Sequence, residues 1–312
     1  MVEKLNPAAV QKLGSKKVRT SLDPGAERIL ELADGRKLCF AEFGASDGFP
    51  VIALHGTPGS RLMHAPAHDA AARLGLWIIS PDRWGYGGSD VHPRPSLSAY
   101  AKDVEALSNG LNVNEFAVVG TSGGAPFALA VAAAMKKRVA RLALVSPMGP
   151  TTPAGEMHIY HHLCFRLLPR IPGAPTALCG FYRFLLFTNP RVALAIGSLA
   201  TVRVDQELIR IPVYRDHLRE TFRTGLADGP AGPATDLKLF SRPWDIALNG
   251  IDARTRVWLG TEDRICPKQR HGRLRRKFRL RNSRCSTVKG TFGSRADIPR
   301  CSRGSRSDSA GA

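Results

Sequence analysis

One serine of this 312-residue chain lies in the pattern that nucleophilic catalysis requires. Apolar residues at 116–119 precede the motif Gly-Thr-Ser-Gly-Gly at 120–124, and an alanine-rich run follows at 127–135. A G-x-S-x-G turn between a buried strand and a helix lifts the serine hydroxyl away from the backbone, where a general base can reach it. The helix N-terminus adds free N–H groups and a partial positive charge. The pattern predicts Ser122 as a nucleophile; the alternative is a glycine-rich turn without chemistry.

Three further stretches mix glycine with polar residues directly after a short apolar run. They are His-Gly-Thr-Pro-Gly at 55–59, Asp-Arg-Trp-Gly-Tyr-Gly-Gly-Ser-Asp at 82–90 and Gly-Thr-Glu-Asp-Arg-Ile-Cys-Pro at 260–267. The apolar runs before them, at 50–54, 76–80 and 256–259, are predicted strands. Each stretch is therefore expected to be a loop at the end of a strand, where reactive side chains are often carried.

The elements that carry these loops alternate between strand and helix. The runs 28–32 and 37–43 surround Ala33-Asp34-Gly35, which predicts a hairpin. Helices are predicted at 62–74 and 96–111, the second with Ser96 or Ser98 as its N-cap. Such alternation predicts an α/β fold with a mainly parallel, doubly wound sheet.

The alternation stops after Pro147 and resumes only near Trp244. The residues between them carry four predicted helices separated by proline and glycine, at 156–168, 177–188, 191–202 and 205–224. The sequence therefore predicts an α-helical insertion between two parts of one sheet.

The four motifs, in this order, resemble those of the α/β-hydrolase superfamily, in its serine esterase-like branch, over residues 28–267. The resemblance implies an α/β-hydrolase fold in which the helical insertion is a lid. It divides the chain into an N-terminal arm at 1–27, a first core part at 28–148, the lid at 149–240, a second core part at 241–267 and an aberrant basic tail at 268–312.

The resemblance also implies roles for single residues. Thr57 and Gly123 would supply the two backbone N–H groups of an oxyanion hole. Asp263, with Glu262 as the alternative, would be the triad acid that orients a histidine. His55 is expected to be a structural residue of its loop rather than the catalytic base.

Three departures separate this chain from other branches. The serine at position 122 differs from the aspartate of the branches that resemble haloalkane dehalogenases and epoxide hydrolases, so dehalogenation is not expected. The motif at 55–59 differs from the H-G-G-P-G of the proline iminopeptidase-like branch, which disfavours a peptidase. Trp84 stands where many relatives carry proline, and we expect a less rigid loop there.

The triad histidine is absent from the place where the family carries it. In the family a Gly-His pair follows the last strand, whereas residues 286–294 of this chain contain no histidine. His271 is the only histidine after Asp263, and eight residues is too short a separation for the usual topology. The base is therefore unassigned, with His271 as the substitute candidate.

The composition changes abruptly at residue 268. Residues 268–312 hold 14 Lys or Arg and 2 Asp or Glu, against 31 and 24 in the rest of the chain, and only six of them are Leu, Ile, Val or Phe. This composition predicts disorder, without the family's last strand and helix. We hypothesise a shift of reading frame near codon 268. Resequencing the locus tests this, and an alternative frame with neither a Gly-His motif nor an amphipathic helix would refute it.

Charge, cysteine usage and hydropathy exclude several other classes of protein. The net charge of +19 is concentrated in the tail, which carries no recognised nucleic-acid reader motif, so specific nucleic-acid binding is not expected. The six cysteines lack paired or metal-like spacing and are expected to be reduced thiols. The apolar region 178–200 is interrupted by arginine and proline, and residues 1–14 lack the apolar run of a signal peptide. We expect a soluble, cytoplasmic protein without membrane contact.

No cofactor or metal is expected. His158, His161 and His162 share one helical face of the lid, but no carboxylate completes a ligand set, so they are interpreted as lid residues. The aromatic residues of the lid are expected to pack it and to line an apolar acyl pocket; they are Tyr160, Phe165, Phe181, Tyr182, Phe184 and Phe187.

The sequence therefore predicts a serine α/β-hydrolase that cleaves an ester or related acyl bond of a small molecule through an acyl-enzyme, with activity impaired by the missing base. One alternative is an inactive hydrolase-like protein that binds a small apolar ligand. Another is nucleic-acid binding through the basic tail. The sequence does not indicate an oligomeric state.

Overall fold

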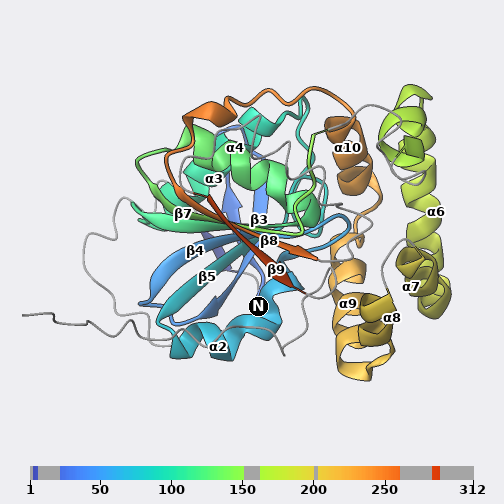
Figure 1. Ribbon diagram of the computed structural model, residues 1–312, viewed down its shortest axis with the longest axis horizontal. Coiled ribbons are helices and arrows are strands. Elements are labelled where there is room, and N and C mark those ends of the chain that lie inside the picture. Colours follow the sequence, from blue (N-terminus) through green and yellow to red (C-terminus); the bar gives the residue numbers. More distant parts are fainter. Residues whose placement is uncertain (1–2, 6–21, 151–161, 200–202, 261–282, 289–312) are drawn as a thin grey trace, which may run out of the picture.

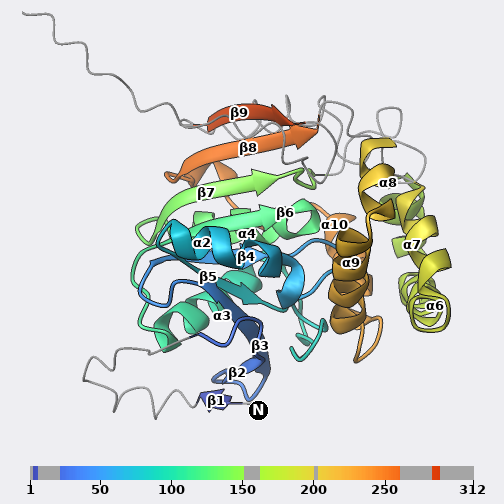
Figure 2. The same cartoon turned by 90° about the horizontal axis from the view of Figure 1, so that it is seen from below.

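A nine-stranded sheet runs through the centre of the molecule (Figures 1 and 2). The structure is a computed structural model that describes residues 3–5, 22–150, 162–199, 203–260 and 283–288. The strands are β1 (Glu3–Leu5), β2 (Arg28–Glu31), β3 (Lys37–Gly44), β4 (Phe49–Leu54), β5 (Leu76–Pro81), β6 (Phe116–Thr121), β7 (Val139–Val145), β8 (Arg254–Gly260) and β9 (Ser283–Val288).

The strand order is β1-β2-β3-β5-β4-β6-β7-β8-β9. Strand β3 is antiparallel to both of its neighbours, β2 and β5, and every other neighbouring pair is parallel. The predicted α/β fold with a mainly parallel sheet is confirmed. The predicted hairpin is also confirmed, since β2 and β3 pair across a turn in which Gly35 has a φ of +81°.

Helices cover both faces of the sheet, as the doubly wound prediction requires. Helices α3 (Leu97–Gly110) and α4 (Ala125–Ala134) lie on one face (Figure 1). The short helices η1 (Arg61–Ala67) and α2 (His68–Arg73) lie on the other. Ser96 is the N-cap of α3, and its hydroxyl accepts a hydrogen bond from the Ala99 N–H at 3.1 Å.

The main core lies between the sheet and the α3–α4 layer. Helix α4 is apolar on all sides and is buried from Ala125 to Ala132, which places it at the centre of this core. Val118 of β6, Leu107 of α3 and Leu129 of α4 belong to the same buried cluster. A smaller cluster that includes Phe43 forms the core under η1 and α2.

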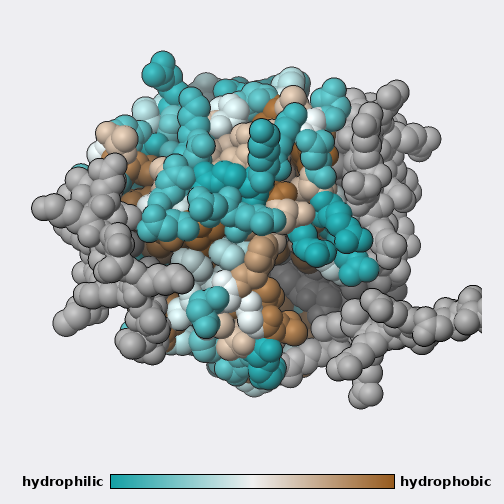
Figure 3. All heavy atoms as spheres, turned by 90° about the vertical axis from the view of Figure 1, so that its left-hand side faces the viewer, coloured by the Kyte–Doolittle hydropathy of each residue, from teal (hydrophilic) through white to brown (hydrophobic). Residues whose placement is uncertain are grey.

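A group of helices stands at one side of the sheet and corresponds to the predicted lid (Figures 1 and 2). It comprises the short turns η4 (Leu163–Leu167) and η5 (Leu168–Arg170) and the helices α6 (Ala174–Thr188), α7 (Pro190–Ser198), α8 (Arg203–Arg210), α9 (Pro212–Gly225) and α10 (Ala231–Phe240). The face of the molecule turned away from these helices is mainly hydrophilic where it is coloured (Figure 3). The single turn η6 (Leu248–Gly250) leads back to β8.

Two lid helices differ from the sequence prediction. The helix predicted at 205–224 is divided into α8 and α9, because Ile211 before Pro212 is extended and Pro212 starts a new helix. Helix α10 was not predicted, since Gly232 has a low helix propensity and a Gly-Pro pair usually indicates a turn. Its burial against the core offsets that penalty.

The C-terminal tail contains a strand, which corrects the expectation of a tail without regular structure. Strand β9 pairs in parallel with β8, with Val257 opposite Cys285 and Gly260 opposite Val288. Without β9, strand β8 would be the edge of the sheet and would present unpaired N–H and C=O groups, which β9 satisfies. The composition of 268–312 as a whole conceals this segment, because a strand of six residues contributes little to the average.

The predictions for the N-terminal arm, the cysteines and membrane-spanning segments can be compared with the structure only over the described residues. Strand β1 lies in the N-terminal arm, for which no strand was predicted, and it pairs with β2 of the first core part. Cys39 and Cys179 are free and buried, as expected of reduced thiols. Within the described ranges, no helix combines the length and the apolar character needed to cross a membrane.

Candidate active site

Ser122 lies at a sharp turn between strand β6 and helix α4. Its φ is +49°, in the left-handed region that a residue with a side chain seldom adopts. The glycines of the motif allow the turn: a Cβ on Gly120 would lie 2.6 Å from the Cβ of Ala128. A hydrogen bond of 3.0 Å from the Met148 N–H to the Ser122 carbonyl holds the turn from the other side. The geometry is that of a nucleophile elbow.

The loop at 55–59 follows β4 and lies beside the elbow. A Cβ on Gly56 would lie 3.5 Å from the Ser122 Cβ, so the backbone of this loop faces the serine. A Cβ on Gly123 would lie 3.2 Å from the Thr57 nitrogen and would overlap the Thr57 hydroxyl. Among the residues that the structure describes, the Thr57 N–H has no hydrogen-bond acceptor. Thr57 and Gly123 are therefore adjacent to each other and to Ser122, as an oxyanion hole requires.

His55 is a structural residue of this loop. Its Nδ1 lies 2.8 Å from the Gly56 carbonyl oxygen, and its Nε2 accepts a hydrogen bond of 3.0 Å from the Arg83 N–H. These partners assign the proton to Nδ1. Burial, together with the Arg83 charge, holds the pKa of His55 well below its usual value. The ring is thus neutral and fully hydrogen-bonded, and it joins loop 55–59 to loop 82–90.

A buried polar cluster joins these two loops to helix α10 of the lid. The Asp236 carboxylate accepts hydrogen bonds from Thr57 Oγ1 at 2.5 Å, Arg83 Nη1 at 2.6 Å and Tyr86 OH at 2.6 Å. Arg83 Nη2 donates to Thr57 Oγ1 and to the Gly56 carbonyl, both at 3.0 Å. Nothing in the sequence indicated Asp236, because the lid carries no recognisable motif.

Asp82, the first residue of the loop at 82–90, stabilises this loop through hydrogen bonds to its carboxylate. Its carboxylate accepts from the Arg61 N–H at 2.5 Å, from Arg61 Nη1 at 2.7 Å and from the Gly88 N–H at 3.3 Å. The Ser89 hydroxyl donates to the Asp82 carbonyl at 2.8 Å, which closes the loop on itself. These bonds support the prediction that the loop is mainly structural.

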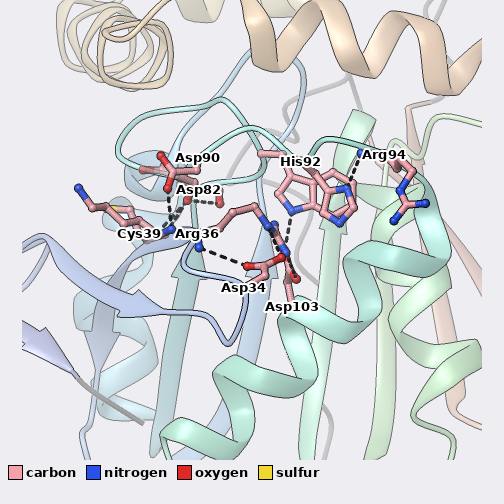
Figure 4. Close-up of polar contacts among 11 residues, drawn as sticks. Asp34, Arg36, Cys39, Asp82, Asp90, His92, Arg94 and Asp103 are labelled. Atoms are coloured by element: carbon pink, nitrogen blue, oxygen red, sulfur yellow. Dashed lines mark hydrogen bonds and ion pairs between the residues drawn. The ribbon is translucent and has the colours of Figure 1, made fainter.

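Trp84 anchors this loop, so the expectation of a less rigid loop is wrong. Its Nε1–H donates to Asp103 Oδ2 at 2.6 Å, and its ring packs edge-on against Tyr100. Arg36 holds the same carboxylate with two bonds of 2.7 and 2.8 Å (Figure 4). The indole replaces the stiffness of a proline by burial and a hydrogen bond.

Met63 is a further neighbour of the serine that the sequence did not indicate. Its Sδ accepts a hydrogen bond from the Gly56 N–H at 3.3 Å. Its Cε would lie 3.5 Å from a Cβ on Gly56, on the side that faces Ser122. Met63 therefore supplies a flexible apolar side chain near Ser122.

The remaining candidates fall outside the described residues. They are Asp263, Glu262, His271, His158 and His161. His162 is described and half-buried. Within the described part of the chain, no side chain hydrogen-bonds the Ser122 hydroxyl, and no group of three or more His, Cys, Asp or Glu could hold a metal ion.

Comparison with known sequences relates the first half of the chain to one family. The profile of the α/β hydrolase fold family matches residues 50–160. A non-heme chloroperoxidase of Streptomyces lividans is 34% identical over 129 residues, which cover 38% of this chain and 44% of the relative. A 2-hydroxymuconate semialdehyde hydrolase of Pseudomonas putida is 28% identical over 235 residues, covering 72% and 73%. The chain spans about half the length of most curated relatives that it matches.

Comparison with solved structures extends the likeness to most of the chain. An esterase from Exiguobacterium antarcticum superposes with a TM-score of 0.62 at 18% sequence identity, over 84% of this chain and 91% of the esterase. At this identity the likeness establishes a common fold.

Proposed function

Because this chain belongs to the α/β-hydrolase fold superfamily, we propose that it is a serine hydrolase that cleaves an ester or related acyl bond of a small molecule. The observation that carries the proposal is the backbone of Ser122, whose φ of +49° presents its hydroxyl beside Thr57 and Gly123. A left-handed serine costs free energy, about 1–3 kcal/mol for such strain, and strain of this kind is concentrated at functional sites.

The proposed reaction passes through an acyl-enzyme. The Ser122 oxygen attacks the carbonyl carbon of the substrate while its proton moves to a base. The carbonyl oxygen becomes an oxyanion that accepts hydrogen bonds from the N–H groups of Thr57 and Gly123. The tetrahedral intermediate expels the alcohol, which takes up the proton, and a water molecule then hydrolyses the acyl-serine by the same steps.

The base of this reaction is not assigned. Asp263 is proposed as the acid that would orient it, and His271 is the substitute candidate. Loss of the base still leaves about 10³–10⁴-fold catalysis over water in the known serine protease case, supplied by the oxyanion hole and substrate binding. We therefore propose slow turnover rather than none.

An inactive protein that binds a small apolar ligand is the second candidate. The absence of a histidine from residues 286–294 favours it. The intact elbow and the neighbouring Thr57 favour the hydrolase instead, because substitutions in an unused site are not selected against. Nucleic-acid binding through residues 268–312 is the third candidate, favoured only by their charge.

Hydrolysis of p-nitrophenyl esters separates these candidates. Turnover that is lost in Ser122→Ala supports the hydrolase, and a further loss in His271→Ala would identify the base. Equal background rates in the wild type and in Ser122→Ala would favour the ligand-binding protein. Salt-sensitive DNA binding that disappears when residues 268–312 are deleted would support the third candidate.

A further inference from the structure

The orientation of one peptide group decides whether the proposed oxyanion hole exists. The Gly56 carbonyl and the Thr57 N–H belong to the same planar peptide, so they point in opposite directions. The carbonyl accepts from Arg83 Nη2 at 3.0 Å and lies 2.8 Å from His55 Nδ1. With its oxygen fixed by two donors, the peptide is expected to aim its N–H away from them.

Arg83 is itself held in place by Asp236. Both residues are almost fully buried, with 1% and 2% of their surface exposed. Their ion pair of 2.6 Å therefore acts in surroundings of low dielectric, where a charge left without its partner is strongly unfavourable. The same carboxylate accepts from the Thr57 hydroxyl at 2.5 Å, so Asp236 fixes the side chain of Thr57 directly and its peptide through Arg83.

The lid reaches this cluster through two close approaches of its backbone. A Cβ on Gly225, at the end of α9, would overlap the Gly59 carbonyl oxygen, and the Gly225 carbonyl accepts from the Gly87 N–H at 3.1 Å. A Cβ on Gly232, at the start of α10, would lie 2.5 Å from the ring of Tyr86. Asp236 follows one turn later on α10. This end of the lid is therefore in direct contact with both loops beside Ser122.

We propose that Asp236 is a positioning residue. It connects helix α10 of the lid to the loop at 55–59 by holding Arg83 and Thr57, and so sets the direction of the Thr57 N–H. The proposal rests on the proposed hydrolase function for its catalytic consequence, but the positioning of the loop can be measured without turnover. Asp236 touches no reacting atom in this account, and its effect is transmitted through Thr57.

The test is amide hydrogen exchange of the peptides that cover residues 55–63, in the wild type and in Asp236→Asn. The substitution keeps the shape of the side chain but removes its charge and one acceptor. We expect exchange in this loop to become at least about 10-fold faster, because its local opening is no longer opposed. Asp103→Asn is the matched control: Asp103 is also buried and paired with an arginine, but it lies on helix α3 and binds Arg36 and Trp84 rather than the loop at 55–59. Exchange at 55–63 is therefore expected to stay within about 2-fold of wild type.

Two variants of Thr57 make the test independent of the folding of Asp236→Asn. Thr57→Val removes the hydroxyl and is expected to accelerate exchange in the same loop. Thr57→Ser keeps the hydroxyl and is expected to restore wild-type exchange. If neither Asp236→Asn nor Thr57→Val accelerates exchange at 55–63, or if Asp103→Asn accelerates it as much, the proposal is overturned.

Ester hydrolysis kinetics test the catalytic consequence of this positioning. In an active wild type, Asp236→Asn should lower kcat by about 10–100-fold with KM changed by less than about 3-fold, since a displaced oxyanion donor affects the transition state. An unchanged kcat in a protein with faster loop exchange would overturn the catalytic part of the proposal. A wild type without Ser122-dependent turnover would refute the proposed function instead, and the exchange results would still decide the positioning.

Discussion

Ser122 combines the proposed role of a nucleophile with a strained backbone. The left-handed conformation at φ +49° is destabilising for a residue with a Cβ and is tolerated readily by glycine. At this scale the protein gives up stability to present one hydroxyl group.

Replacement of Ser122 should reveal that strain. We expect Ser122→Gly to be more stable than Ser122→Ala by about 1 kcal/mol, because both lose the hydroxyl and only glycine relieves the positive φ. Urea unfolding of the two variants measures the difference. Equal unfolding free energies would show that the serine is not strained at this position.

Two histidines, the buried His55 and the half-buried His64 with its buried Nε2, should make the fold sensitive to mild acid. Burial lowers the pKa of His64 to about 4 and that of His55 well below its usual value. Their pKa in the unfolded chain is about 6.5, so below this pH the unfolded state binds protons that the folded state excludes, and stability falls as the pH falls. Each histidine contributes a slope of up to about 1.4 kcal/mol per pH unit between pH 6.5 and its folded pKa.

Urea unfolding between pH 7 and pH 5 measures this slope. His64→Gln should flatten it, since glutamine can keep the contact with the Ser80 hydroxyl but does not titrate. An unchanged pH dependence in this variant would mean that His64 is protonated equally well in the folded protein.

At this scale the sequence was informative only where a motif existed. The turn glycines predicted Ser122 at a strand-to-helix turn, and the resemblance predicted Thr57 and Gly123 as oxyanion donors. The structure places Thr57 beside Gly123, and the donor role of both stays a prediction. Asp236 could not be predicted from the sequence, because its role depends on contacts with residues far away in the chain, such as Arg83. The roles of Asp263 and His271 stay predictions.

At the scale of elements, the loops beside Ser122 are held by their own polar side chains together with carboxylates from two helices, Asp103 of α3 and Asp236 of α10. Trp84 is the clearest case, since its indole reaches Asp103 on α3. Many relatives carry proline at the position of Trp84, and the sequence analysis expected a looser loop because it considered backbone stiffness alone. The rigidity of this loop depends on tertiary contacts instead.

Trp84→Phe should therefore destabilise the fold by about 1–3 kcal/mol, because Asp103 loses a buried donor that a phenyl ring cannot replace. Trp244→Phe is the matched control, since the buried Trp244 Nε1–H has no hydrogen-bond partner among the described residues. Urea unfolding should show a clearly smaller loss for Trp244→Phe. Losses of the same size in both variants would assign the effect to ring size alone.

At the scale of the whole molecule, the fold could be predicted well up to β8 and poorly beyond it. Alternating strands and helices indicated the sheet, and proline and glycine marked most lid boundaries. The exceptions, α10 and β9, are elements whose local propensity is weak and whose stability depends on packing or pairing with distant parts of the chain. The frame-shift hypothesis for residues after 267 stays open to resequencing.

Strand β9 should contribute measurably to the stability of the sheet. A chain ending at residue 282 lacks β9 and exposes the edge of β8, whereas a chain ending at residue 288 keeps the pairing. We expect the shorter chain to have a Tm lower by about 5 °C or more and to aggregate more readily, since an unpaired edge is a template for other strands. Equal Tm values for the two truncations would show that the β8–β9 pairing adds nothing.

The central claim is that Ser122 is a nucleophile in a formed oxyanion hole, and covalent labelling tests it most directly. A fluorophosphonate probe transfers its phosphonyl group to an activated serine with loss of fluoride, and peptide mass spectrometry locates the adduct. We predict a single adduct on Ser122 in the wild-type chain and none in Ser122→Ala. A wild-type chain that stays unlabelled under conditions that label an active serine hydrolase, or an adduct that persists in Ser122→Ala, would contradict the account.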